Sequence, residues 1–240
     1  KLIIKNSISE VPLHKALILL DVIQDFKVSQ ELFDLQRLAF AKQLVFSCSN
    51  LHFGPEVGVS RRKKEDAPVV ELWFNQVSKM ADDLQSHTSF ASTPAEVYLG
   101  DARDLEIILT DNSIHALITS PPYPNEKDYT RTTRLESVLL GFVVEQEDLR
   151  HNKKRLLRSN SRNIYKGDTD ESYVESSDRV MSLARQIEER RIELGKTSGF
   201  EKMYHRVVKN YFGGMVRHLR ELKPMLTSGA QLAYVVGDQA

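Results

Sequence analysis

The chain has 240 residues, 41% of them hydrophobic and 28% charged, with 33 Lys and Arg balanced by 33 Asp and Glu. This length permits one large domain or two small ones, and the balanced charge means that any phosphate-binding surface must come from local clusters. The lone cysteine, Cys48, excludes an intrachain disulfide and is expected to be a small buried hydrophobe. Without a signal peptide or an apolar run of about 18 residues, we expect a cytoplasmic protein with no membrane span.

Residues 1–95 are predicted to form a helical region. Apolar residues recur at three- and four-residue spacing in 32–46 and again in 69–84, as on one face of a helix. Between them, residues 50–66 are rich in glycine and proline and are predicted to be a loop. The basic run Arg61–Lys64 in this loop has two interpretations, a DNA contact or a solvated loop.

After residue 95 the pattern changes to that of an α/β protein. Glu96–Leu99 is a β-prone run that ends at Gly100-Asp101, residues 105–109 are compatible with a helix, and 115–119 are predicted to be a buried strand. This order of strand, helix and strand predicts a parallel sheet in a three-layer α/β domain.

Residues 124–199 are predicted to be a polar, mostly helical insertion. Its clearest helix covers about 180–194, with Gly195 just past its end. The pattern then predicts three elements in chain order: a long helix over 200–222, a turn at Ser228-Gly229 and a buried strand over 231–236.

The stretch Thr119-Ser120-Pro121-Pro122-Tyr123 follows an apolar strand, and ligands of open α/β sheets lie beyond the carboxyl ends of the strands. Two prolines fix the backbone and remove two donors, so the carbonyls project as rigid acceptors. Two acceptors holding the protons of an exocyclic amino group would localise its lone pair for attack, and Tyr123 offers a flat face for a flipped base. The alternative is a proline-stiffened turn in an unrelated domain.

This motif resembles the signature of the DNA amino-methyltransferases, which is Asp, Asn or Ser followed by Pro-Pro-Tyr or Pro-Pro-Phe. The serine form is typical of the cytosine N4 branch. The resemblance continues in 97–105 and in 222–238, and covers about 96–123 and 200–240 in all. It implies that residues 96–240 form the catalytic part of a Rossmann-like class I methyltransferase core, which uses S-adenosylmethionine and flips its target base.

The resemblance also implies roles for individual residues. Ser120, Pro121, Pro122 and Tyr123 are expected to be catalytic, and Asp101 and Thr119 to bind the cofactor. Asp101 is alternatively a simple strand-end residue. Methylation at cytosine carbon 5 needs a thiolate that usually follows a proline, and Cys48 lies in a different context. The seven histidines lack ligand spacing, so no metal site is expected.

A cluster of basic residues follows the motif and is predicted to contact DNA through phosphates. The expected DNA-binding residues are Arg131, Arg134, Lys153, Lys154, Arg155, Arg158 and Arg162. The alternatives are a solvated surface helix balanced by neighbouring acidic residues, and arginines paired to local acids.

The glycine-rich cofactor loop of the family, an aromatic residue followed by Gly-x-Gly, is absent from the sequence. Because the order of the two halves is permuted in this family, we expect the chain to be a fragment, with the missing loop before Lys1, after Ala240 or on another polypeptide. The expected partners are double-stranded DNA and either a restriction nuclease or a second methyltransferase segment. Three alternatives to cytosine N4 methylation stay open: adenine N6 methylation, methylation of glutamine side chains or RNA, and a non-catalytic DNA-recognition or partner subunit.

Overall fold

The computed structural model describes residues 2–3, 5–54, 57–90, 92–124 and 128–237. The chain divides into two compact units, here called unit 1 (residues 1–96 and 129–150) and unit 2 (residues 97–128 and 151–240). The first boundary lies next to the predicted one at residue 95. Residues 129–150, which the sequence placed in an insertion of the C-terminal part, group with the N-terminal helices instead.

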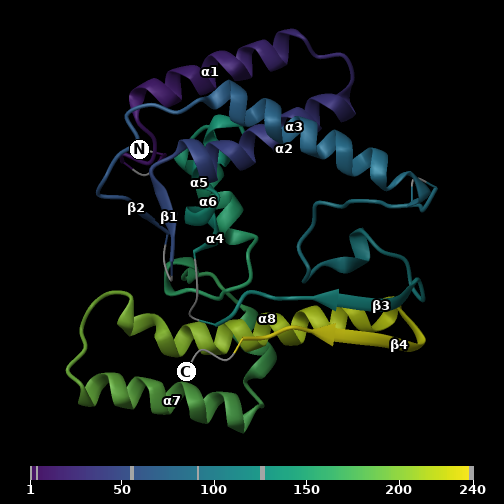
Figure 1. Ribbon diagram of the computed structural model, residues 1–240. Coiled ribbons are helices and arrows are strands. Elements are labelled where there is room, and N and C mark those ends of the chain that lie inside the picture. The colour runs from purple at the N-terminus through teal and green to yellow at the C-terminus, as the bar shows by residue number, and fades with distance from the viewer. Residues whose placement is uncertain (1, 4, 55–56, 91, 125–127, 238–240) are drawn as a thin grey trace. The chain divides into compact units, whose positions relative to one another are not determined.

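Unit 1 is mainly helical, and α1, α2 and α3 pack against one another (Figure 1). The apolar spacing predicted two of these helices, and the structure confirms them. Ser29 caps the start of α2 by accepting a hydrogen bond from the backbone nitrogen of Leu32. The helical elements are α1 (Glu10–Asp25), α2 (Gln30–Gln43), the π-helical turn η1 (Leu44–Cys48), α3 (Val69–Ser86), the 3-10 turn η2 (Thr88–Phe90), α4 (Tyr129–Thr132) and α5 (Arg134–Leu139).

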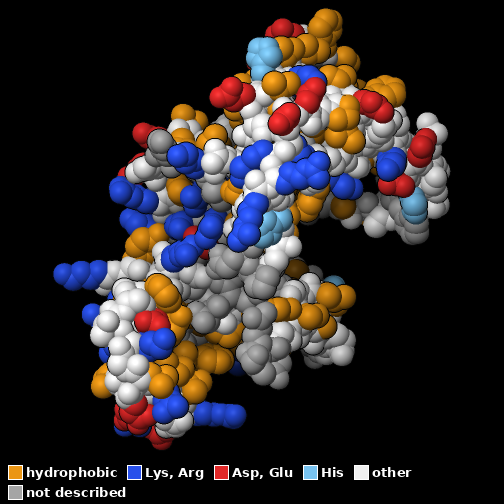
Figure 2. All heavy atoms as spheres, turned by 60° about the vertical axis from the view of Figure 1, so that its left-hand side comes forward, with side chains coloured by type: hydrophobic (Ala, Val, Ile, Leu, Met, Phe, Trp, Pro, Cys, Tyr) orange, Lys and Arg blue, Asp and Glu red, His pale blue; other side chains and the backbone are white. Residues whose placement is uncertain are grey.

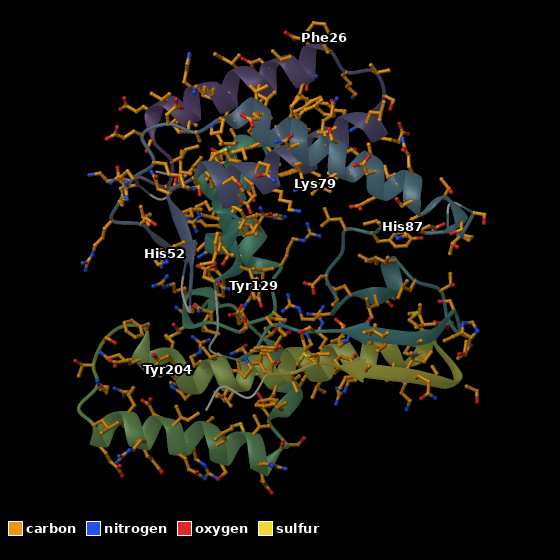
Figure 3. All side chains as sticks on the ribbon, in the orientation of Figure 1. Phe26, His52, Lys79, His87, Tyr129 and Tyr204 are labelled. Carbon is orange, nitrogen blue, oxygen red and sulfur yellow. The ribbon has the colours of Figure 1, made fainter. Side chains whose placement is uncertain are left out.

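The core of unit 1 lies between these helices, where their side chains meet (Figure 3). Cys48 is fully buried in it, as predicted, and burial raises the pKa of its thiol. Trp73 Nε1 donates to the backbone oxygen of Gln36 and ties α3 to α2. The buried members are Ala16, Leu19, Ile23, Phe33, Phe40, Leu44, Cys48, Ala67, Val69 and Leu135.

The predicted loop over 50–66 contains a short antiparallel hairpin, β1 (Leu51–Phe53) and β2 (Val57–Val59), which the sequence did not indicate. Asn50 organises the segment, because its amide nitrogen donates to Asn6 and Ser9 and its oxygen accepts from the backbone of Lys64. The basic run Arg61–Lys64 is exposed, and Lys and Arg side chains are frequent on the face shown in Figure 2.

Unit 2 is built around α8 (Tyr204–Met225), which packs against α7 (Asp178–Glu193) and the 3-10 turn η5 (Asp170–Val174). The end of α7 is as predicted, with Gly195 at a φ of 63° just beyond it. The other elements are η3 (Leu105–Ile107), β3 (Ile114–Thr119), η4 (Ser161–Asn163), η6 (Glu201–Met203) and β4 (Leu226–Tyr234), and α6 (Gln146–Lys154) spans the boundary of the units.

Gly213 and Gly214 lie in the middle of α8, where glycine is unfavourable to a helix. A Cβ atom at Gly213 would overlap the backbone carbonyl of Asp170, and one at Gly214 would overlap the side chain of Leu157. The glycine pair therefore lets η5 and the Leu157 side chain approach the helix backbone closely. Close packing therefore explains the Gly213-Gly214 pair, which is not part of a glycine-rich cofactor loop.

β3 and β4 pair in parallel. A parallel sheet was predicted, but from the order of the strands expected at 96–99 and 115–119 rather than from this pair. Ile114 pairs with Leu226 but Ala116 pairs with Gln231, so the residues between them on β4 form an irregularity. Gly229 lies in it with a φ of 81°. The predicted turn at Ser228-Gly229 is therefore an interruption within one strand.

The strand predicted at 96–99 was wrong, and the buried strands predicted at 115–119 and 231–236 form β3 and β4 but are not buried, since Leu232 of β4 is 44% exposed. Residues 96–99 form no strand, and the side chains of Val97 and Leu99 are 98% and 89% exposed. β3 is not a buried strand, since Ile118 is 83% exposed. Within the described ranges, the parallel sheet has two strands only, so the structure is mixed α/β without the full Rossmann-like sheet. None of the helices described here is long and apolar enough to cross a membrane.

Candidate active site

The loop Ser120–Tyr123 leaves the carboxyl end of β3 beside the segment that leaves β4. The backbone nitrogen of Val235 donates to the Thr119 oxygen at 2.9 Å and extends the strand ladder by one step. The Ser120 hydroxyl then donates to the Val235 oxygen at 3.2 Å. The four predicted catalytic residues thus lie where the topology placed them, at the carboxyl edge of a parallel pair.

The hydrogen bond from Ser120 decides which role its hydroxyl can have. A hydroxyl group has one proton and two acceptor lone pairs. Because the Val235 carbonyl can only accept, the Ser120 proton is used there and the lone pairs of Oγ are available to other donors. Ser120 is exposed, so a bound group can reach these lone pairs.

The ring of Tyr123 lies against the backbone of Gly237, in the segment that follows β4. A Cβ atom at Gly237 would overlap the ring carbons of Tyr123. The absence of a side chain at this position therefore sets where the ring lies. Gly237 was not predicted to contribute to the site, and no local sequence pattern identifies it, because the contact joins two loops far apart in the chain.

Asp101 is held by Arg103 through three hydrogen bonds. The Arg103 side chain donates to Oδ1 at 2.9 Å and to Oδ2 at 2.7 Å, and its backbone nitrogen donates to Oδ1 at 3.0 Å. Arg103 also donates to Asp170 at 2.6 Å, and Arg217 pairs with both Asp170 and Asp104. We call these five residues the Arg103 network.

Two members of the Arg103 network, Arg103 and Asp170, are buried, whereas Asp101, Asp104 and Arg217 are partly exposed. Arg103 is 7% exposed and Asp170 is 4% exposed. Burial by itself lowers the pKa of Arg103, but hydrogen bonds and charges of Asp101 and Asp170 outweigh it and raise the pKa. Burial likewise raises the pKa of Asp101, but the hydrogen bonds and charge of Arg103 and the charge of Arg217 lower it overall. Both partners therefore keep their charges over the physiological pH range.

His218 and Tyr234 join the site and were missed by the sequence analysis. His218 Nε2 lies 2.6 Å from the Tyr234 hydroxyl, and Nδ1 lies 2.7 Å from the Ala102 oxygen. Tyr234 ends β4 and pairs with Thr119. The two rings come from different elements, so neither spacing nor periodicity indicates that they meet.

The basic residues predicted to bind DNA have different environments. Arg158 is buried, and its guanidinium pairs with Asp168 and donates to the carbonyls of Lys153, Lys154 and Leu156. This geometry gives Arg158 a structural role, and we leave it out of the DNA-binding set. Lys153 pairs with the buried carboxylate of Asp128 at 2.8 Å. By contrast, Lys154, Arg155 and Arg162 are exposed.

Arg131 and Arg134 belong to unit 1, whereas the loop at Ser120 belongs to unit 2. Arg131 lies in α4 and Arg134 begins α5, and both are partly buried. Arg134 Nε donates to the backbone oxygen of Thr130 at 3.2 Å. The expectation that both arginines contact DNA stays a prediction.

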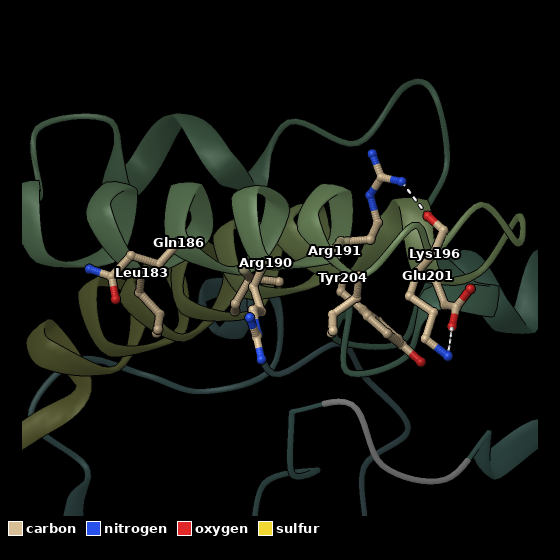
Figure 4. A pocket seen from close by; sticks show the side chains of 9 residues that line it. Leu183, Gln186, Arg190, Arg191, Lys196, Glu201 and Tyr204 are labelled. Carbon is tan, nitrogen blue, oxygen red and sulfur yellow. Dashed lines mark hydrogen bonds and ion pairs between the residues drawn. The ribbon is translucent and has the colours of Figure 1, made fainter.

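A hollow of about 410 Å³ lies between α7 and the start of α8 (Figure 4). Its basic residues are neutralised, since Arg190, Arg191 and Lys196 pair with Glu193, Glu188 and Glu201 respectively. None of the predicted site residues lines it. Among the described residues, no group of three His, Cys, Asp or Glu is arranged to hold a metal ion.

Comparisons of the chain with protein families, with curated proteins and with solved structures found no match.

Proposed function

We propose that this chain is the catalytic part of an S-adenosylmethionine-dependent DNA methyltransferase that acts on the exocyclic amino group of cytosine. The observation that carries the proposal is the hydrogen bond from Ser120 to the Val235 oxygen. Because this bond uses the Ser120 proton, the lone pairs of Oγ are available to accept at the carboxyl edge of β3 and β4. The resemblance to the Ser-Pro-Pro-Tyr motif implies an acceptor at this position.

In this proposal the protein supplies position and preorganised acceptors. The lone pairs of Ser120 Oγ accept one amino proton of the flipped base, and the Pro121 carbonyl accepts the other. Tyr123, whose ring is seated by Gly237, stacks on the base. The amino nitrogen is then held in the form whose lone pair is localised for attack, and no covalent bond to the enzyme is formed.

The residues present fit only the adenosyl side of the cofactor. An ionised carboxylate offers about four acceptor positions, and three hydrogen bonds to Asp101 leave about one of them for a cofactor hydroxyl. Thr119 lies at the carboxyl edge of the sheet, at the end of β3. When bound, S-adenosylmethionine supplies an electrophilic methyl group on a sulfonium centre.

A second polypeptide segment is part of the proposal. Parallel sheets are normally covered on both faces, yet Ile118 of β3 and Leu232 of β4 are 83% and 44% exposed. Val97 and Leu99 are also exposed, beside the proposed cofactor residue Asp101. These apolar surfaces, together with the missing aromatic-x-Gly-x-Gly segment, support a methyltransferase core that a further segment completes.

DNA is proposed to contact the exposed cations Lys154, Arg155 and Arg162 through its phosphates. Lys154 is the last residue of α6, and Arg155 and Arg162 follow this helix in unit 2. Replacing phosphate-contacting cations weakens binding similarly on all sequences and reduces its salt dependence. Exposed cations of this kind favour the DNA substrate over a glutamine side chain.

The proposal is tested by the product of the reaction. The intact protein is incubated with labelled S-adenosylmethionine and duplexes of varied sequence, and the nucleosides are identified by mass spectrometry. We expect N4-methylcytosine. If the product is N6-methyladenine, the target base is adenine. If the protein binds DNA but transfers no methyl group, it is a recognition subunit.

Replacing Gly237 by alanine is expected to slow methyl transfer about 10- to 100-fold, because displacement of the Tyr123 ring by about 1 Å spoils the geometry of the stacked base. The rate is measured at saturating cofactor, and thermal unfolding is expected to change little. Gly199→Ala is the matched control, since a Cβ atom there meets nothing within 4 Å. A Gly237→Ala variant with the original rate would show that the ring position is unimportant.

A further inference from the structure

His218 is hydrogen-bonded through both nitrogens of its ring, and the chemistry of its partners fixes the tautomer. The Ala102 carbonyl can only accept, so Nδ1 carries a proton. In the neutral ring Nε2 is then an acceptor, and the Tyr234 hydroxyl donates to it. Burial raises the pKa of Tyr234, which favours the protonated phenol that this bond needs.

The three groups come from three segments of unit 2. His218 lies on α8, Tyr234 is the last residue of β4 and Ala102 follows Asp101. Tyr234 pairs in register with Thr119, directly before the Ser120–Tyr123 loop. The His218 ring is therefore the connection between the loop with Asp101 and the strand end with the amino-group acceptors.

Strand pairing does not supply this connection. In the part of the chain that the structure describes, β3 pairs with β4, and residues 97–104 pair with neither strand. The ion pairs of the Arg103 network tie the Asp101 loop to η5 and α8, and none of its five residues lies on β4. His218 thus adds a direct side-chain connection between the Asp101 loop and the end of β4.

We propose that His218 is a positioning residue which, through Ala102 and Tyr234, holds the Asp101 loop at a fixed distance from the Ser120–Tyr123 loop. The functional part of this inference rests on the proposed function, in which Asp101 holds the cofactor and Ser120 the target base. In-line transfer between two bound molecules is sensitive to displacements of about 1 Å, so a rigid link between their two holders is required. Tyr234 connects His218 to the end of β4, because its hydroxyl hydrogen-bonds to Nε2 of the His218 ring.

The test uses the intact protein with variants of the two rings. His218→Phe and Tyr234→Phe remove the link, whereas His218→Gln keeps one donor and one acceptor and is the conservative replacement. His115→Gln, on an exposed position of β3, and Tyr204→Phe, at the opposite end of α8, are the matched controls. The readouts are nitrogen-15 NMR of the His218 ring, amide hydrogen exchange of residues 100–104, and calorimetric binding of S-adenosylhomocysteine.

The proposal expects that Nδ1 of His218 carries a proton in the original protein. It expects faster exchange of residues 100–104 in His218→Phe and Tyr234→Phe, and a Kd for S-adenosylhomocysteine raised about 5- to 10-fold, the effect of losing one or two hydrogen bonds. His218→Gln is expected to bring the Kd back to within about twofold, because its amide replaces both hydrogen bonds.

Two results would overturn the inference: exchange of residues 100–104 that does not change in the Phe variants, or a neutral His218 ring protonated at Nε2. If the original protein binds no S-adenosylhomocysteine and transfers no methyl group, the proposed function fails. The exchange measurement still decides whether His218 fixes the Asp101 loop, so the two failures are distinguishable.

Discussion

Replacing Ser120 by alanine is expected to lower the rate of methyl transfer about 100-fold at saturating cofactor and DNA. Removal of one preorganised hydrogen-bonding group that acts in the transition state typically costs about 10²–10³ in kcat. In this protein the group is an acceptor, since the Ser120 proton is used by the Val235 oxygen. The affinity for S-adenosylmethionine should be nearly unchanged, because Ser120 is proposed to contact the base and not the cofactor.

Ser228→Ala is the control for this variant, because Ser228 is exposed on β4 at the irregularity of the strand. It should keep the original rate. The measurement is a single-turnover experiment with labelled cofactor, which separates the methyl transfer step from product release. If the Ser120→Ala variant transfers the methyl group at the original rate, Ser120 does not accept the amino proton.

Replacing Arg103 by methionine is expected to reduce the free energy of unfolding of unit 2 by about 3–5 kcal/mol. Breaking a buried ion pair by removing one partner leaves an uncompensated buried charge, and this cost is typically of that size. In the Arg103 network, Asp101 loses its ion-pair partner, and Asp170 loses the shorter of its two ion pairs and keeps the one with Arg217. Chemical denaturation of the whole chain measures the effect.

The matched control is Arg190→Met. Arg190 forms an ion pair with Glu193 on the surface of α7, where both side chains are more than 60% exposed. Exposed pairs contribute about 0–1 kcal/mol, so this variant should unfold almost like the original protein. Equal stability of the two variants would contradict the buried network.

The same network predicts how stability depends on pH. The pKa of Asp101 is lowered in the folded protein from its ordinary value of 3.8. Its contribution is therefore fully present above that value and is lost as the pH falls through the lowered folded pKa. Arg103→Met should weaken this loss in acid, since the variant no longer stabilises the ionised carboxylate.

Local pattern was sufficient for the helices and for one strand. The apolar spacing in 69–84 and 180–194 indicated helices that the structure confirms, because the burial of a helix face repeats every three to four residues. β3 was predicted from an apolar run before the Ser120 loop, whereas its pairing with β4 was not predicted. The predicted catalytic loop lies at the expected edge for the same reason.

Features that depend on distant partners could not be predicted. Glu96–Leu99 has the composition of a strand, but strand formation depends on neighbouring strands, and the described residues provide none for it. Arg103 pairs with Asp170, which is 67 positions away in the chain. Arg158 has the sequence context of a surface cation, but it is buried against Asp168. The chain sequence around these residues holds no periodic signal for such contacts.

A crystal structure of the intact protein with its substrate duplex and S-adenosylhomocysteine decides whether the Ser120–Tyr123 loop holds the amino group to be methylated. We expect a flipped cytosine whose amino nitrogen lies about 2.7–3.2 Å from Ser120 Oγ and from the Pro121 carbonyl, with Tyr123 against the base. A flipped base bound elsewhere, or a duplex that never contacts this loop, would show that the loop does not hold the target.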